Sequence, residues 1–157
     1  MKAILQRVSN AMVSVNSTKI ANIGMGYLIL LGIEHHDTLL DAKAMVLKIQ
    51  NLRLFPNQDG KFDQSLLDIN GDVLVVSQFT LMADCSKGRR PNFLNAAPPN
   101  IAQPLLDQTV GLFKEQATGK VETGLFGADM AVTLTNDGPV TIYLDSHTFV
   151  SNKNKSN

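Results

Sequence analysis

The pattern of hydrophobic and polar positions divides the chain into strand-like runs separated by turn residues. Uninterrupted apolar runs at residues 27–33 and 73–76 are typical of strands that are buried on both faces. Shorter or more loosely alternating runs predict the other strands: residues 2–8, 11–15, 18–23, 120–126, 130–135 and 140–144. The sequence therefore predicts a protein in which most of the regular structure is β-sheet.

Turn residues suggest how these strands are connected. Ser9 and Asn10 predict a hairpin between the first two strands, and residues 57–60 predict another hairpin tip. The segment 136–139, with the sequence Asn-Asp-Gly-Pro, predicts a turn between the last two strands. Its Gly138-Pro139 bond is open to either isomer, because the trans preference before proline is only about 0.5–1 kcal/mol.

Two segments have helical instead of strand periodicity. Asp37 and Thr38 offer an N-cap, and apolar residues recur at helical spacing from there to residue 54. Prolines 98 and 99 suit the first turn of a second helix over residues 101–116. The stretch 82–99 between strand and helix has no regular pattern, and loops of this length in a compact domain are usually functional.

Composition narrows the class of protein. A chain of 157 residues with 44% hydrophobic residues is expected to form one domain, since domains commonly contain about 100–200 residues. Its single cysteine, Cys85, cannot form an internal disulfide, and no apolar run reaches the ~18 residues of a membrane span. We expect a cytoplasmic protein with no membrane partner, a domain over residues 1–146 and a polar, disordered tail over residues 147–157.

The charges and motifs exclude several functions. Fourteen basic and fourteen acidic residues cancel, so no global field attracts nucleic acid. Lys87, Arg89 and Arg90 form one local basic run, which is either a solvated loop or a phosphate contact. The three histidines have no zinc-site spacing, and the nucleotide-binding glycine motifs are missing. We expect no metal and no cofactor.

The segment 77–81, with the sequence Ser-Gln-Phe-Thr-Leu, places polar groups at the mouth of the buried strand 73–76. Binding and catalytic groups usually occupy such strand ends and loops. Ser77, Thr80 and Cys85 are possible nucleophiles, but no G-x-S-x-G elbow surrounds the serine or the threonine. The residues alone leave open whether this strand end is a site or simply reaches solvent.

Several motifs together resemble one family, the D-aminoacyl-tRNA deacylases. Ser-Gln-Phe-Thr-Leu at 77–81 and Asn-Asp-Gly-Pro-Val-Thr at 136–141 resemble its two signatures, in the same order. The other similar segments are 6–8, 88–91, 96–99 and 127–130. The resemblance runs from Met1 to about Ser146, and only the tail departs from it.

The resemblance implies an α/β fold with mixed, largely antiparallel sheets and two main helices, as a three-layer α/β/β domain that forms a homodimer. It implies hydrolysis of the ester between tRNA and a D-amino acid, or glycine mischarged on tRNA-Ala, while L-aminoacyl-tRNA is rejected. The partners would be the aminoacyl-tRNA acceptor end and a second copy of the chain.

The resemblance also implies roles for individual residues. The carbonyls of Gly138 and Pro139, joined by a cis bond, would enter the other subunit's pocket and hold the substrate's α-amino group. Main-chain atoms there would exclude an L side chain whatever its identity. Arg7 would fix the inserted turn, and Lys87, Arg89 and Arg90 would lie near tRNA phosphates.

At the ester, the resemblance places Gln78 and the backbone N–H of Phe79, the latter as an oxyanion donor. Thr80 would be a site residue without a covalent role, because the ribose 2′-OH of the tRNA is expected to assist hydrolysis. Further residues would approach the ribose or line the pocket: Ala102, Phe126 and Met130.

Two alternatives stand beside this hypothesis. A non-catalytic nucleic-acid-binding dimer would use Arg89 and Arg90, and its binding would be sensitive to salt. A small-molecule esterase would use Thr80 or Cys85 as the nucleophile and accept simple esters.

Overall fold

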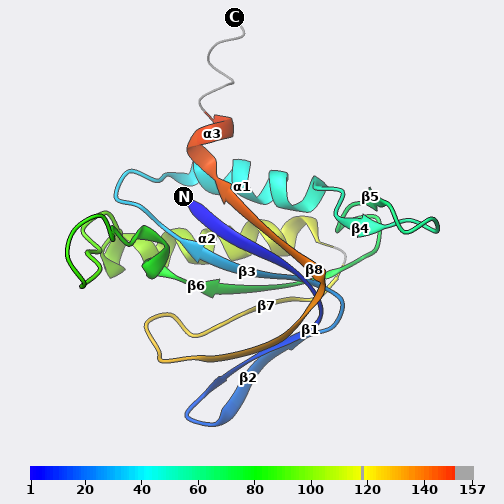
Figure 1. Ribbon diagram of the computed structural model, residues 1–157, viewed down its shortest axis with the longest axis horizontal. Coiled ribbons are helices and arrows are strands. Elements are labelled where there is room, and N and C mark those ends of the chain that lie inside the picture. The colour runs from blue at the N-terminus through cyan, green and yellow to red at the C-terminus, as the bar shows by residue number, and fades with distance from the viewer. Residues whose placement is uncertain (118, 151–157) are drawn as a thin grey trace, which may run out of the picture.

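A computed structural model describes residues 1–117 and 119–150 of the chain. One large mixed sheet forms the centre of the protein (Figure 1). The elements follow one another along the chain as β1 (Lys2–Val15), β2 (Thr18–Ile23), β3 (Gly26–Gly32), α1 (Leu39–Asn51), β4 (Phe55–Pro56), β5 (Phe62–Gln64), β6 (Asp72–Ser77), the 3₁₀ turn η1 (Phe79–Met82), α2 (Pro99–Gln116), β7 (Val121–Thr123), β8 (Ala131–Asp145) and α3 (Ser146–Val150).

The large sheet combines antiparallel and parallel pairs. Its strand order is β2-β1-β3-β6-β7, and β8 also pairs with β1. The pairs β3–β6 and β6–β7 are parallel, whereas the pairs that β1 makes with β2, β3 and β8 are antiparallel. Because β3, β6 and β7 run in the same direction, their carboxyl ends lie at one edge of the sheet, where α/β proteins commonly bind ligands.

The expected hairpin at Ser9 and Asn10 is wrong. Residues 2–15 form the single strand β1, which pairs with β3 along its first half and with β2 along its second half. Ser9 and Asn10 are exposed within this strand. A long bent strand that changes partners gives the same local pattern as two short strands, because the turn residues are also tolerated where a strand reaches solvent.

The expected turn at 136–139 does not reverse the chain either. Both halves of β8 pair antiparallel with β1. The main interruption lies between Gln6↔Thr141 and Val8↔Asn136, and a second register shift follows between Val8 and Asn10. Residues 137–140 therefore stand opposite the single residue Arg7 and form a large bulge in β8. Such bulges redirect the local backbone and are common beside active sites.

Two hydrophobic clusters lie on the two faces of the sheet. Helices α1 and α2 cover one face (Figure 1) and bury a cluster that includes Met45, Ile49 and Phe113 against strand residues. The second cluster contains strand residues alone, among them Val13 and Leu74, because the sheet curls over itself. This arrangement of helix layer, sheet and curled strands confirms the expected mixed α/β class with two main helices.

The helices begin close to where the sequence predicts. Thr38 caps α1, and Asp41 completes a capping box with it. Pro98 is the N-cap of α2 and Pro99 its first residue. Within the part of the chain that the structure describes, no helix is both long and apolar enough to cross a membrane.

The end of the domain differs from the expectation of a tail starting at His147. Residues 146–150 form the short helix α3, which packs against α1, and residues 151–157 lie outside the described part. The Ser146 hydroxyl donates to the Asp41 carboxylate at 2.8 Å and accepts from the Met1 ammonium at 3.0 Å. The buried Asp37 carboxylate also accepts from that ammonium.

Asp41 is expected to make stability depend on pH. Burial alone would raise the pKa of Asp41, but hydrogen bonds from Thr38 and Ser146 and the nearby N-terminal ammonium hold this pKa below its ordinary value. The stabilisation from a lowered folded-state pKa is complete above the unfolded-state pKa and is lost as pH falls through the folded-state pKa. Replacing Asp41→Asn should therefore lower the free energy of unfolding at pH 7 by about 1–2 kcal/mol.

Urea denaturation at pH 7 and pH 3 measures this difference. We expect the difference in free energy of unfolding between the natural protein and the Asp41→Asn variant to be smaller at pH 3 than at pH 7. The control Asp107→Asn changes an exposed position on α2 and should leave the free energy of unfolding nearly unchanged at both pH values. An equal gap at pH 7 and pH 3 would contradict the assignment.

Candidate functional site

A cavity of about 510 Å³ lies where β3 and β6 end. Its walls come from the ends of these two strands, the segment before α2, the first turn of α2 and the segment after β7. The lining residues are Leu31, Ile33, Ser77, Gln78, Phe79, Ala96, Ala97, Pro99, Ala102, Phe126, Gly127, Ala128, Asp129 and Met130. The parallel pairing of β3 with β6 thus positions most of the polar groups of the cavity.

Five residues proposed from the sequence meet in this cavity: Gln78, Phe79, Ala102, Phe126 and Met130. They come from three segments that are far apart in the chain. Thr80 does not line the cavity but is exposed beside it, and its hydroxyl accepts a hydrogen bond from the Gln78 amide. This contact orients the Gln78 side chain.

The backbone at Phe79 presents an unpaired donor. Gln78 continues the strand pairing, since its N–H donates to Leu31 at 2.8 Å, and its carbonyl accepts from Leu81 at 3.2 Å. Phe79 is the first residue of η1, and such a residue has no acceptor within its own helical turn. No other described residue accepts from its N–H. This N–H is available to an oxygen atom of a ligand.

The cavity is mostly apolar, and Asp129 is the one charged residue among those that line it. No histidine, lysine or cysteine belongs to the lining set, so the described walls supply no nucleophile paired with a base. The first turn of α2 also borders the cavity, and no side chain caps it. Its partial positive charge favours developing negative charge nearby.

Arg7 forms a second centre, away from this cavity. Its side chain is buried and donates to the Leu54 carbonyl at 2.6 Å and the Asp137 carbonyl at 3.2 Å. It also pairs with the Asp137 carboxylate at 3.0 Å, and the Phe62 ring lies 5.6 Å from the guanidinium carbon. Burial raises the pKa of the neighbouring Tyr27, although the Arg7 cation opposes this. Arg7 therefore fixes the bulge of β8 to the segment after α1.

The bulge holds itself in place as well. The Asn136 side chain accepts from the Val140 N–H at 3.2 Å and donates to the Thr141 hydroxyl at 2.9 Å. Gly138 has φ +117°, and a Cβ added there would lie 2.9 Å from the Arg7 Nη2 atom. The Gly138-Pro139 bond, which the residues alone left open, is cis, as the family resemblance implies. Neither residue lines this cavity, and both are exposed.

The basic residues Lys87, Arg89 and Arg90 are exposed near the tip of the loop between η1 and α2. The loop is closed at its base by paired backbone hydrogen bonds between Asp84 and Asn92, of 2.7 and 3.0 Å. The other side of the loop leads directly into the cavity wall at residues 96–97. The basic run thus lies on a loop that continues into the cavity wall, and none of its residues lines the cavity.

Comparison with known proteins assigns the family. Residues 4–145 match the family described as D-Tyr-tRNA(Tyr) deacylase. The chain belongs to this family. It is 51% identical to the D-aminoacyl-tRNA deacylase of Thermomicrobium roseum over 93% of this chain and 94% of that one. It is also 51% identical to the D-aminoacyl-tRNA deacylase of Roseiflexus sp. over 99% of each chain.

Solved structures agree with the deacylase family fold. The structure of the c-Myc DNA Unwinding Element Binding Protein has a TM-score of 0.86 and 41% identity, over 92% of this chain and 98% of that one. A probable eukaryotic D-amino acid tRNA deacylase has a TM-score of 0.79 over the same shares. Its 17% identity makes it evidence for the fold alone.

Sequence reasoning missed several residues of this deacylase family member. Leu31, Ile33 and Asp129 line the cavity, and Leu54, Phe62 and Asp137 surround Arg7. The alternate positions 31 and 33 at the end of a buried strand were a usable signal, as was the Gly-Ala-Asp-Met segment at 127–130. Leu54 and Phe62 had no signal, because their contact with Arg7 depends on the fold.

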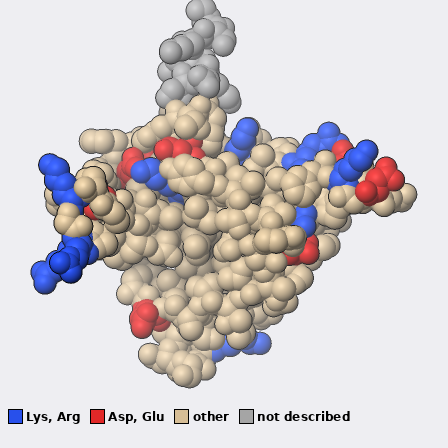
Figure 2. Space-filling model, viewed as in Figure 1, with Lys and Arg blue, Asp and Glu red and all other residues tan. Residues whose placement is uncertain are grey.

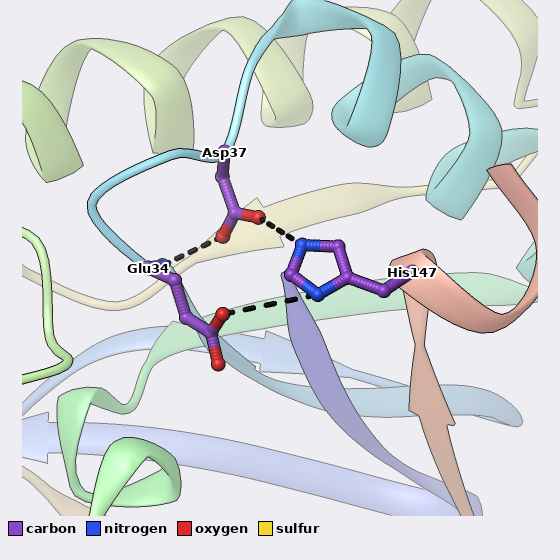
Figure 3. A group of neighbouring side chains, drawn as sticks. All are labelled: Glu34, Asp37 and His147. Carbon is purple, nitrogen blue, oxygen red and sulfur yellow. Dashed lines mark hydrogen bonds and ion pairs between the residues drawn. The ribbon is translucent and has the colours of Figure 1, made fainter. Parts of the chain in front are cut away.

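A cluster of Glu34, Asp37 and His147 is the one group of described residues with metal-ligand types close together (Figure 3). His147 lies just beyond the matched family segment. Its Nδ1 faces Glu34 at 3.9 Å and its Nε2 faces Asp37 at 3.5 Å, so opposite ring nitrogens face the two carboxylates. Asp37 already accepts from the Met1 ammonium and the Glu34 N–H. This geometry fits a polar cluster that joins α3 to the segment before α1.

Close approach of η1 to β3 depends on Gly32. A Cβ at this position would lie 2.6 Å from the Met82 methyl carbon and 2.9 Å from the Gln78 carbonyl oxygen. Replacing Gly32→Ala should displace the segment that carries Gln78 and Phe79 and lower the free energy of unfolding by about 1–3 kcal/mol.

Urea denaturation tests this, with Gly111→Ala as the matched control. Nothing lies within 4 Å of a Cβ at Gly111, which is inside α2, so alanine there should raise stability by up to about 1 kcal/mol. Equal stabilities of the Gly32→Ala variant and the natural protein would show that the close packing is not required.

Proposed function

We propose that this protein hydrolyses the ester bond of D-aminoacyl-tRNA and spares the L form. Membership of the D-Tyr-tRNA(Tyr) deacylase family and the relatives named D-aminoacyl-tRNA deacylase support this activity. The observation that carries it in the structure is the unpaired N–H of Phe79, beside the Gln78 amide, at the mouth of a mostly apolar cavity. Such a donor is suited to the oxyanion of an acyl-transfer transition state.

The chemistry needs only positioning and electrostatic stabilisation. A water molecule adds to the ester carbonyl carbon, and the Phe79 N–H stabilises the negative oxygen that forms. The bond to the tRNA 3′-oxygen then breaks, and this oxygen leaves with a proton. Asp129 is the only ionisable side chain among the described cavity walls, and it is exposed, so we assign proton transfer to the ribose 2′-OH of the substrate itself.

Within the same proposal, Gly138 and Pro139 select chirality in the cavity of a second copy of the chain. Both residues are exposed on a bulge and do not line the cavity of their own subunit. Their carbonyls would accept hydrogen bonds from the substrate's α-amino group and occupy the space of an L side chain. A main-chain wall discriminates at the α-carbon, so it serves many amino acids.

A wall of this kind has a consequence for glycine. Glycine has no side chain, so the bulge cannot exclude it by steric contact. The proposal therefore includes hydrolysis of glycyl-tRNA, including glycine mischarged on tRNA-Ala. Ala102 would approach the terminal ribose, while Phe126 and Met130 would contact the rest of the aminoacyl-adenosine.

The tRNA acceptor end is the proposed macromolecular partner. Lys87, Arg89 and Arg90 lie on the loop that leads into the cavity wall, which suits contacts with phosphates. The net charge of zero fits a protein that holds only one end of the tRNA. Action on tRNA is consistent with the cytoplasm as the compartment.

Nucleic-acid binding without catalysis is the second candidate. One specific observation favours it: the 41%-identical solved structure is of a protein named for binding a DNA element. The esterase alternative has less support, because Cys85 does not line the cavity and the Thr80 hydroxyl interacts with an amide and not with a base. A paired assay of D- and L-aminoacyl-tRNA separates all three.

The test compares release of D- and L-tyrosine from tyrosyl-tRNA by the natural protein and two glycine variants. In Gly138→Ala the new Cβ, at a positive φ and 2.9 Å from Arg7, should displace the carbonyls. We expect the natural protein to hydrolyse the D form selectively. The variant should lose at least about tenfold of its D-tyrosine release, and with it the D/L ratio, because displaced carbonyls no longer hold the α-amino group.

Gly60→Ala is the matched control, since Gly60 also has a positive φ of +75° but no atoms within 4 Å of an added Cβ. It should keep the D/L ratio of the natural protein. Hydrolysis of neither form, or equal hydrolysis of both by the natural protein, would refute the proposed function. Turnover of simple esters that stops in Thr80→Ala or Cys85→Ala would favour the esterase.

A further inference from the structure

An apolar surface lies just outside the mouth of the cavity. Phe79 and Leu94 expose 55% and 79% of their surface, and 79% is the highest value among the large exposed hydrophobic residues described. Phe93, the residue before Leu94, is half-buried. Its ring packs edge-on against the Phe79 ring, with 5.1 Å between the ring centroids. We call Phe79, Phe93 and Leu94 the rim platform.

The rim platform is held in place by the backbone. The Leu94 N–H donates to the Asn92 side chain at 2.8 Å, and the Leu94 carbonyl lies 3.0 Å from the His35 ring. The Ala97 N–H donates to the Ile33 carbonyl at 2.9 Å. The backbone of Leu94 is therefore fixed on both sides while its side chain stays exposed.

Unpaired cations stand next to the rim platform. Lys87, Arg89 and Arg90 are exposed and form no ion pair with a described residue, as is also true of several lysines elsewhere on the surface. In Figure 2 lysines and arginines gather on the left of the molecule, where Figure 1 shows the loop between η1 and α2. Arg90 is three residues from Phe93, which an extended chain spans in about 10 Å.

The combination of apolar rings with neighbouring cations fits a strand of nucleic acid. Proteins that bind single strands place bases on aromatic side chains and phosphates near Lys and Arg. The uncompensated positive charge at the loop tip argues against an apolar protein segment as the occupant of this surface.

The cavity limits which bases reach the rim platform. Phe79 lines the cavity, but Phe93 and Leu94 do not. A volume of about 510 Å³ is in the range of sites that enclose one drug-sized ligand, such as an amino acid with one nucleoside. If the cavity encloses the aminoacyl-adenosine, the preceding nucleotides lie outside it, and the rim platform adjoins the cavity at Phe79.

We propose that the rim platform stacks the bases that precede the terminal adenosine of the single-stranded acceptor end, while Lys87, Arg89 and Arg90 contact the adjoining phosphates. This inference rests on the proposed function and names a binding surface for the same substrate. It assigns Phe93 and Leu94 to positioning of the tRNA and not to the chemical step.

The test uses an uncharged acceptor-stem RNA with 2-aminopurine in place of the penultimate base, whose fluorescence falls when it stacks. The natural protein should quench the probe on binding. Phe93→Leu and Leu94→Ser should lose most of the quenching at saturation and raise Kd by about tenfold. Leu94→Ser changes a side chain that is largely in solvent, so its folding is not at risk.

Two controls separate stacking from charge. Ile20→Ser, an exposed position on β2, should change neither Kd nor quenching. Arg89→Ala with Arg90→Ala should raise Kd and weaken its salt dependence but leave quenching at saturation intact.

Two results would contradict base stacking on the rim platform. One is saturable binding without quenching, and the other is equal quenching by Phe93→Leu, Leu94→Ser and the natural protein. D-aminoacyl-tRNA hydrolysis together with either result would leave the proposed function standing. Quenching that depends on Phe93 and Leu94, without any hydrolysis, would support the rim platform and refute the deacylase activity.

Discussion

The buried guanidinium of Arg7 is the constraint on which the proposed site depends. A cation taken out of water is costly unless hydrogen-bond acceptors and an opposite charge surround it. Asp137 supplies both a carbonyl and a carboxylate, and Leu54 supplies a second carbonyl. Because all these partners must be present at once, Arg7 ties the bulge of β8 to the segment that follows α1.

The fold separates two functional parts that the proposed reaction must combine. The cavity with Gln78 and Phe79 lies where the parallel strands end, while Gly138 and Pro139 project from β8 elsewhere on the same subunit. The proposed hydrogen-bond donor for the ester and the proposed carbonyls for the amino group therefore do not line the same cavity of one chain. A second copy of the chain, contributing its bulge, would complete the site.

Local chemistry made much of the fold predictable. The buried apolar runs of β3 and β6 and the prolines at the start of α2 are local features of the sequence. The pattern of apolar residues and prolines was therefore sufficient to predict these three elements. The expected hairpin at Ser9 and the expected turn at Asn136 were wrong, because a strand that bends or bulges carries the same residues as a true reversal.

The site was less predictable than the fold. Short motifs named Gln78, Phe79 and the Gly138-Pro139 pair, but the packing that connects Phe62 and Leu54 to Arg7 exists only after distant segments meet. The polar composition after Ser146 concealed helix α3, whose order depends on contacts with α1 and the Met1 ammonium.

The central claim is that main-chain atoms of one subunit select the D substrate in the cavity of another subunit. Mixed dimers made from Gln78→Ala and Gly138→Ala subunits test it most directly, by the rate of D-tyrosyl-tRNA hydrolysis. If the site crosses the interface, each mixed dimer contains one intact site, and random mixing should restore about a quarter of the natural rate. If the mixture hydrolyses D-tyrosyl-tRNA as slowly as the two separate variants, the bulge of β8 serves the cavity of its own subunit and the account is wrong.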